Sequence, residues 1–194
     1  MSDSSNTIVD IEATPQDAAR LADVIRSRLV SEGIVEPEIS DSALGSEGAH
    51  RPGPNYRIAI ESAVGDPGFL GLMTNGLEIR SGRQIFTAFA NGLELRCDAC
   101  GSTLDLIENS DSAASTLSEW LDACDAWSKG GDQVSFACPK CGQRALLAEW
   151  RGPWPWGFGN LGLTFWNWPP LSEKFVQTIT SKLRHRTVLV RAHI

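Results

Sequence analysis

The sequence lacks long apolar stretches and any targeting signal. Its apolar runs are far shorter than the roughly 20 residues that a membrane-spanning helix needs. Residues 1–6 are polar and contain neither the basic region nor the apolar segment that opens a secretory signal. Five cysteines also argue against a disulfide framework, because an odd number leaves one thiol unpaired. We therefore expect a cytoplasmic protein with reduced thiols and no membrane partner.

Recognisable catalytic motifs are absent as well. The sequence contains no H-E-x-x-H, P-loop or G-x-S-x-G, and its three histidines, His50, His185 and His193, form no constellation with serine or aspartate. Residues 157–162 match G-x-G-x-x-G, but a dinucleotide site needs a strand before this motif and a helix after it. Here a segment rich in proline and tryptophan precedes the motif and an aromatic strand follows it. No catalytic residue is predicted, which favours a non-enzymatic protein; an enzyme with its site on the α/β part is an alternative.

The chain is acidic, and the charge is unevenly distributed. Its net charge is −7, and residues 1–66 carry all of it, with 12 acidic and 5 basic residues. Such a field does not attract phosphate backbones, which disfavours nucleic acid as a partner. Nucleic-acid binding stays an alternative because four basic residues follow one another near the end of the chain, Lys182, Arg184, Arg186 and Arg191.

The most specific feature is a set of two C-x-x-C pairs, Cys97 with Cys100 and Cys138 with Cys141. An x-x spacer lets both sulfurs of a pair reach one ion at about 2.3 Å, and four thiolates complete a structural zinc site. Gly101 and Gly142 follow the pairs and tolerate the positive φ that each knuckle needs. The sequence therefore predicts a structural Zn²⁺ bound by these four cysteines, a closed site with no open position for catalysis.

The alternatives to zinc are iron in the same sulfur cage, a redox dithiol or a decayed site. A redox C-x-x-C usually opens a helix in a βαβ unit, whereas these pairs lie at strand ends. Cys124 is the remaining thiol. It lies between Trp120 and Trp127 on the apolar face of an expected helix, which predicts packing in the core rather than reactivity.

Helix and strand signals alternate along the chain. Helices are expected after the N-caps Thr14, Thr116 and Ser172, and Gly33 is expected to end the first. Strands are expected at residues 8–11, 56–60, 103–107, 134–138, 145–150, 161–168 and 187–190. Residues 36–55 and 108–115 are interpreted as a loop and a polar linker, and Asn75-Gly76 and Asn91-Gly92 as hairpin turns.

These elements indicate an α+β protein. We expect an α/β sandwich, of which the ferredoxin-like fold is one form, with an inserted four-cysteine zinc ribbon. Residues 1–92 would form the N-terminal part of the α/β domain, residues 93–150 the ribbon with a helix, and residues 151–194 the strand–helix–strand that completes the domain.

All seven tryptophans lie between positions 120 and 168. A ribbon has little core of its own, so large rings at its base are expected to be buried where it meets the sheet. Trp154 and Trp156 lie in a proline-rich loop and are the best candidates for an exposed surface. Because tryptophan is a favoured anchor in interfaces, these two residues are predicted to bind a protein partner.

The two C-x-x-C-G elements resemble the zinc-ribbon group over residues 93–150. That resemblance implies metal binding but no particular activity, because ribbons occur in transcription factors, ribosomal proteins and enzymes alike. The segment at residues 154–170, W-P-W-G-F-G-N-L-G-L-T-F-W-N-W-P-P, is similar to bacterial zinc-ribbon proteins of uncharacterised activity with a tryptophan-rich C-terminal segment. The leading hypothesis is a non-enzymatic zinc protein that acts through protein–protein contact, as an adaptor or as an immunity-like inhibitor of a basic target.

Overall fold

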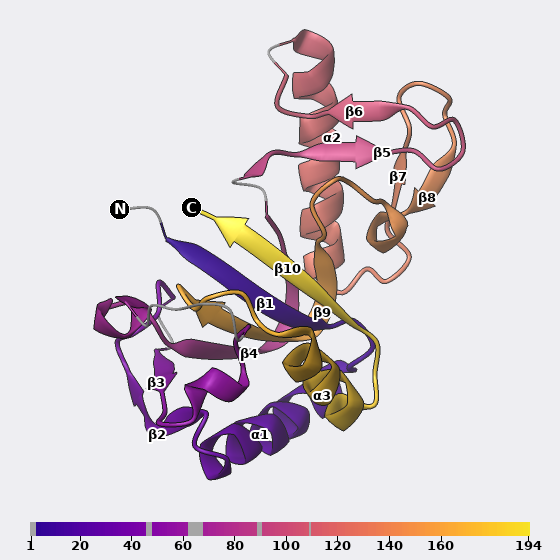
Figure 1. Cartoon of the computed structure of the whole chain (residues 1–194). Helices are drawn as coiled ribbons and strands as arrows, with labels where there is room; N and C mark the ends of the chain where they lie inside the picture. The colour runs from indigo at the N-terminus through magenta and orange to yellow at the C-terminus, as the bar shows by residue number, and fades with distance from the viewer. Residues whose placement is uncertain (1–2, 46–47, 62–67, 89–90, 109) are drawn as a thin grey trace.

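A computed structural model describes residues 3–45, 48–61, 68–88, 91–108 and 110–194. Within these residues six strands form one antiparallel sheet in the order β10-β1-β9-β4-β3-β2 (Figure 1). Their bounds are β1 Ser4–Asp10, β2 Val35–Ser40, β3 Ala49–Pro52, β4 Leu77–Phe86, β9 Gly157–Trp166 and β10 Thr187–His193. The expected α+β class is confirmed.

Helices α1 (Pro15–Ser31) and α3 (Glu173–Leu183) cover one face of the sheet. Both begin as predicted, because the Thr14 and Ser172 side chains accept hydrogen bonds from backbone amides in the first turn. Gly33, with φ +67°, ends the first helical segment as expected. Apolar residues of α1 at Ala18, Leu21, Ile25 and Leu29 face the buried side chains of Leu161, Leu163 and Phe165 on β9.

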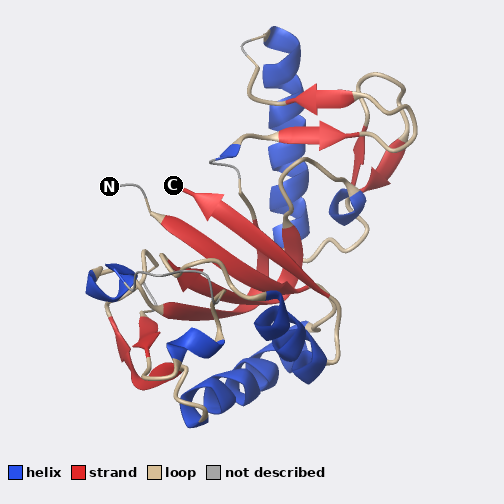
Figure 2. Cartoon of the chain, viewed as in Figure 1, coloured by secondary structure: helices blue, strands red, loops and turns tan. Residues whose placement is uncertain are grey.

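The ribbon, residues 93–150, contains two short hairpins and a long helix (Figure 2). The hairpins are β5 (Glu94–Arg96) with β6 (Thr103–Asp105), and β7 (Ser135–Ala137) with β8 (Arg144–Leu146). The helix is α2 (Asp111–Ser128), and the ribbon also contains the short 3₁₀ turn η4 (Leu147–Glu149). Two further 3₁₀ turns, η1 (Tyr56–Ile58) and η2 (Gly68–Gly71), lie before β4, outside the ribbon. The domain boundaries at residues 92 and 150 stay a prediction.

The predicted start of α2 is wrong. The Ser110 side chain caps the helix by accepting from the Ala113 amide, so α2 begins well before Thr116. Thr116 lies inside the helix, where its hydroxyl donates to the Ser112 carbonyl. Most of the predicted linker at residues 108–115 is therefore helical; its residue 109 lies outside the described residues.

Two predictions in the first third of the chain are also wrong. The expected loop at 36–55 contains β2 and β3, whose polar composition reflects an edge position at which most β2 side chains are exposed. The expected strand at 56–60 instead contains η1, and the alternation that suggested a strand places Ile58 in solvent.

Neither Asn-Gly pair forms a hairpin turn. Asn75 is buried, and its side-chain amide donates to the carbonyls of Phe69 and Leu70. Asn91 donates to the Arg191 carbonyl and accepts from the His193 amide, on the edge strand β10. Both asparagines therefore make tertiary hydrogen bonds, and Asn91 covers part of a sheet edge that would otherwise present free backbone groups.

The ribbon is held to the sheet by a continuous aromatic core. Trp127 of α2 lies edge-on to Phe158 of β9, with ring centroids 5.0 Å apart. Arg83 of β4 stacks on the same indole at 3.8 Å, and its Nε donates to the Trp127 carbonyl. The guanidinium also pairs with Asp132 at 2.6 Å. These contacts fix the C-terminal end of α2 against the sheet.

Replacement of Arg83 by methionine keeps the aliphatic stem and removes these polar contacts. We expect the free energy of unfolding to fall by about 1–3 kcal/mol, because a cation–π contact and two charge-assisted hydrogen bonds are lost. Urea denaturation measures the change. Arg151→Met at a largely exposed side chain is the control, expected to differ from wild type by less than about 0.5 kcal/mol. Equal stability of the two variants would contradict the assigned role of Arg83.

The G-x-G-x-x-G match has a packing explanation. All of residues 157–162 lie within β9, so the motif does not open a helix, and the rejection of a dinucleotide site is consistent with the structure. A Cβ at Gly157 would lie 2.7 Å from the Val9 side chain, and one at Gly162 would collide with the Phe86 ring. The glycines allow close packing on the second face of the sheet.

Gly162→Ala is accordingly expected to lower the free energy of unfolding by about 1–3 kcal/mol through overpacking against Phe86. Gly71→Ala is a matched control, because a Cβ there meets no atom within 4 Å. Thermal and urea unfolding distinguish the two. If Gly162→Ala were as stable as Gly71→Ala, the close approach of Phe86 would be disproved.

Candidate metal centre

The two cysteine knuckles have the same backbone geometry. In the first, the Gly101 amide donates to the Cys97 carbonyl at 2.8 Å and the Cys97 amide donates to Ser102 at 2.9 Å. In the second, Gly142 and Cys138 make the equivalent bonds at the same distances, with Gln143 as the acceptor from Cys138. Gly101 and Gly142 have φ values of +71° and +72°, as the knuckles were expected to need. Each hairpin of the ribbon carries one knuckle at its turn.

The four sulfurs converge, although the pairs are separated in sequence. Cys97, Cys100, Cys138 and Cys141 have all their Sγ atoms within 4.8 Å of one another. The distance is 3.8 Å between Cys97 and Cys141 and 3.9 Å between Cys100 and Cys138. Sulfurs at the corners of a tetrahedron around zinc, with bonds of about 2.3 Å, are roughly 3.8 Å apart. The donor set and spacing therefore fit an ion such as Zn²⁺.

Burial of the cluster is asymmetric. Cys97 and Cys138 are buried in the ribbon core, whereas Cys100 and Cys141 are exposed. Each knuckle thus supplies one inner and one outer sulfur. Four thiolates complete a tetrahedral shell, so an ion bound here has no open position for a substrate.

The thiols influence one another strongly. Hydrogen bonds from the Ser102 side chain and backbone lower the pKa of Cys100 to about 6. At Cys141 the Gln143 backbone amide lowers the pKa, but desolvation and the three neighbouring cysteines outweigh it and raise the pKa to about 12. Once one thiolate has formed, like-charge repulsion opposes the next. A dication at the centre removes this repulsion, because it neutralises charge that the thiolates otherwise carry together.

Cys124 lies outside the cluster. It is half-buried on α2 against the ribbon core, and desolvation raises its pKa to about 11. This agrees with the expected packing role, because the thiolate is the reactive form of cysteine.

The tryptophans divide between core and surface. Trp120, Trp127, Trp150 and Trp168 are buried, whereas Trp154 is 43% exposed. Trp156 is half-buried: its Nε1 donates to the Trp150 carbonyl, and its ring centroid lies 5.8 Å from that of Trp120. Trp154 and Trp156 both line a cleft of about 920 Å³ that also borders Cys97. The two residues predicted to bind a partner therefore adjoin one concave surface next to the metal centre.

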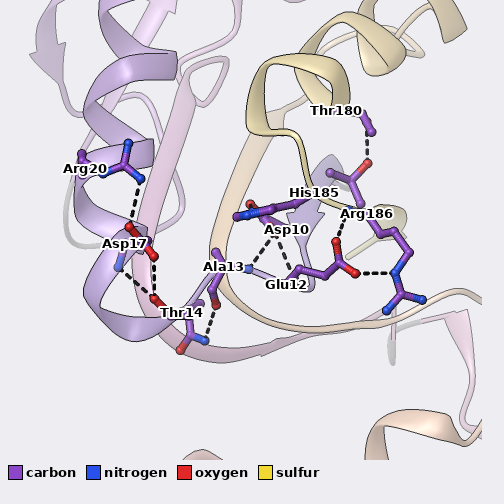
Figure 3. Close-up of polar contacts among 11 residues, drawn as sticks. Asp10, Glu12, Ala13, Thr14, Asp17, Arg20, Thr180, His185 and Arg186 are labelled. Atoms are coloured by element: carbon purple, nitrogen blue, oxygen red, sulfur yellow. Dashed lines mark hydrogen bonds and ion pairs between the residues drawn. The ribbon is translucent and has the colours of Figure 1, made fainter.

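No signal in the sequence indicates a pair between a buried aspartate and a half-buried histidine. Asp10, at the end of β1, accepts from the amides of Glu12 and Ala13 and pairs with Nδ1 of His185 at 2.8 Å (Figure 3). The two residues are 175 positions apart, so no local pattern joins them. The pair joins the turn before α1 to the turn between α3 and β10.

Comparison of the chain with protein-family models, curated proteins and solved structures finds no significant match. The resemblance to zinc ribbons therefore rests on the two hairpins and their cysteines. None of the helices described in the structure is long and apolar enough to span a membrane.

Replacement of one inner sulfur from each knuckle, in Cys97→Ser/Cys138→Ser, is expected to reduce bound zinc from about one ion per chain to a trace and to unfold the ribbon. The reason is that a structural site couples metal binding to folding. Metal analysis of the purified protein measures zinc and distinguishes it from iron, and limited proteolysis reports on residues 93–150. Cys124→Ser is the control and should keep its zinc. Stoichiometric zinc in the double variant would refute the four-cysteine site.

Proposed function

We propose that the four cysteines bind one structural Zn²⁺ and that the protein is a non-enzymatic binding protein whose partner docks at the Trp154–Trp156 loop. The single observation that carries this proposal is the position of Trp154. It alone among the seven tryptophans, all of which the structure describes, is exposed, and it borders a cleft. Exposed tryptophan beside a concave surface is the usual form of an interface anchor.

The metal has a structural part in this proposal. A four-thiolate shell without an open position supports fixation of the two hairpins rather than chemistry at the metal. Thiolate ligands stay reduced most readily in the cytoplasm, which supports that location for the protein. Zinc rather than iron is proposed for the site, and metal analysis is the test.

We also propose that the core is ferredoxin-like. The arrangement of β1, α1, β4, β9, α3 and β10, with strand order β10-β1-β9-β4, supports two split βαβ units sharing one antiparallel sheet. In this interpretation β2 and β3 extend the sheet beyond β4, and the ribbon is inserted between β4 and β9. Such cores serve many activities, so the assignment concerns the fold alone.

An adaptor is favoured over the immunity-like inhibitor. An inhibitor of a basic target would bind through the acidic first third of the chain, which carries all of the net charge. The exposed tryptophan instead lies in the C-terminal segment, beside arginines that also border the cleft. This placement supports a docking surface whose lining contains more basic than acidic side chains.

Capture from the native host tests the docking surface. Affinity-tagged wild type and Trp154→Ala are compared by quantitative mass spectrometry, with Met73→Ala as a control at an apolar side chain that is 79% exposed outside the cleft. A partner captured by wild type and by Met73→Ala is expected to be reduced about tenfold or more with Trp154→Ala, because tryptophan anchors carry a large share of binding energy.

The zinc content of both variants should match that of wild type. Identical capture by wild type and Trp154→Ala would overturn the assignment of this loop as the docking surface.

A further inference from the structure

We infer that the cleft between the ribbon and the sheet binds an acidic segment of a protein partner, with Arg151 and Arg186 pairing with its carboxylates and Trp154 contacting its apolar side chains. This inference rests on the proposed function, because it names the chemistry of the partner that docks at the Trp154–Trp156 loop.

The cleft has two walls from different parts of the chain. One wall lies at the sheet, where β1 ends and β10 begins, and contains Ile11, Arg186 and Val188. Arg96 comes from the ribbon, and Arg151 and Trp154 from the segment that follows it, joined by a backbone hydrogen bond from Arg96 to Arg151. A volume of about 920 Å³ lies near the upper end of the range for ligand sites and suits a peptide segment.

The charge of the cleft is opposite to that of the molecule. Its lining includes four arginines, Arg96, Arg144, Arg151 and Arg186, but only two acids, Asp98 and Glu149. With thiols counted as neutral, the lining carries +2 in a chain of net charge −7, so the remaining residues carry −9. Four thiolates with one zinc dication would add −2 beside Arg96 and Arg144. Arginines gathered in one cleft of an acidic protein favour anionic groups there over the rest of the surface.

Two of the arginines are available for a ligand. Arg96 and Arg144 flank the knuckles, where they would offset the negative charge of a zinc–tetrathiolate centre, and Arg144 donates to Ser135. Arg151 is 80% exposed and lies 4.0 Å from Asp98, a loose pair that a better carboxylate can displace.

Arg186 is held in place at the sheet wall. Its Nε and its backbone amide donate to the two carboxylate oxygens of Glu12, yet its side chain stays 77% exposed (Figure 3). Both contacts lower the pKa of Glu12, the backbone hydrogen bond more than the side-chain one. A guanidinium fixed through Nε still presents its terminal nitrogens, the geometry that suits a carboxylate.

The surroundings favour a peptide over a nucleic acid. A single strand of nucleic acid follows a basic groove over several nucleotides, and its phosphates would meet the −9 carried outside the cleft. A short acidic segment confines its charge to the cleft. The cleft wall beside Trp154 also contains Pro155 and the half-buried Trp156, whose Nε1 donates to the Trp150 carbonyl. Because these residues are already held in place, a peptide that binds there loses little entropy in ordering them.

Fluorescence anisotropy with defined peptides tests the inference on the full zinc-loaded chain. The probe is a fluorescein-labelled dodecapeptide of alternating glutamate and leucine; the comparison probes are the matching lysine–leucine peptide and a twelve-nucleotide oligo-dT. We expect the glutamate peptide to bind and the other two not to bind. Arg151→Glu/Arg186→Glu should weaken that binding at least about tenfold, and Lys174→Glu/Lys182→Glu, the same charge change on α3 outside the cleft, by less than about twofold.

Each outcome decides the inference. Equal loss of peptide binding in the two charge-reversal variants would show a non-specific charge effect and would overturn the inference. Tighter binding of oligo-dT than of the glutamate peptide would also overturn it, because the cleft would then be assigned to nucleic acid. Failure of the acidic peptide while Trp154→Ala still abolishes capture of the host partner would overturn this inference and leave the proposed function standing. The unfolding curves and zinc content of both double variants must match those of wild type. If they do not, Arg151→Gln provides a second test, because it alters only one exposed side chain.

Discussion

The pairing of β4 with β9 is the constraint on which the rest of the structure depends. The two strands pair from Leu77 with Phe165 to Phe86 with Gly157, so residues 87–156 must leave the sheet and return at one point. Closing so long an insertion costs little more entropy than closing a short one, since each doubling of loop length adds only about 0.6 kcal/mol. The sheet can therefore carry the ribbon, provided that the ribbon folds with its two ends together.

The ribbon meets this requirement with three kinds of contact. Its hairpin strands are three residues long, too short to be stable by themselves. The four sulfurs of the two hairpins converge at one end, and Trp120 is fully buried among Phe136, Trp150 and Trp156. At the other end Trp127 lies between Phe158 and Arg83 of the sheet. The aromatic side chains thus make one core out of the ribbon and the sheet beneath it.

The cysteine cluster and the cleft beside Trp154 are adjacent but chemically distinct. A closed sulfur cluster positions its knuckles but offers no site for a substrate. The hairpin β5–β6 that carries Cys97 also pairs with Arg151, which precedes the Trp154–Trp156 loop. The cysteine cluster, Arg151 and the exposed indole therefore lie close together, and the backbone pairing of Arg96 with Arg151 joins the β5–β6 hairpin to the segment that carries Trp154.

Short-range sequence signals predict part of this structure correctly. The spacing of Cys97, Cys100, Cys138 and Cys141 predicts the metal cluster, and Thr14 and Ser172 predict two helix starts, because each of these signals acts over only a few residues. The same reasoning misplaced the start of α2 and took Asn75 and Asn91 for turn residues. Their side chains bond to distant backbone groups, and no local pattern records such a partner.

The sequence alone therefore determined which four cysteines cluster, the α+β class and the concentration of tryptophan around the ribbon. Only the tertiary structure decided which indole is exposed, that Asp10 pairs with His185, and that Arg151 and Arg186 border the same cleft. The physical reason is that burial and charge complementarity depend on residues that the sheet brings together, and β-sheet pairing joins segments whose separation along the chain carries no signal of its own.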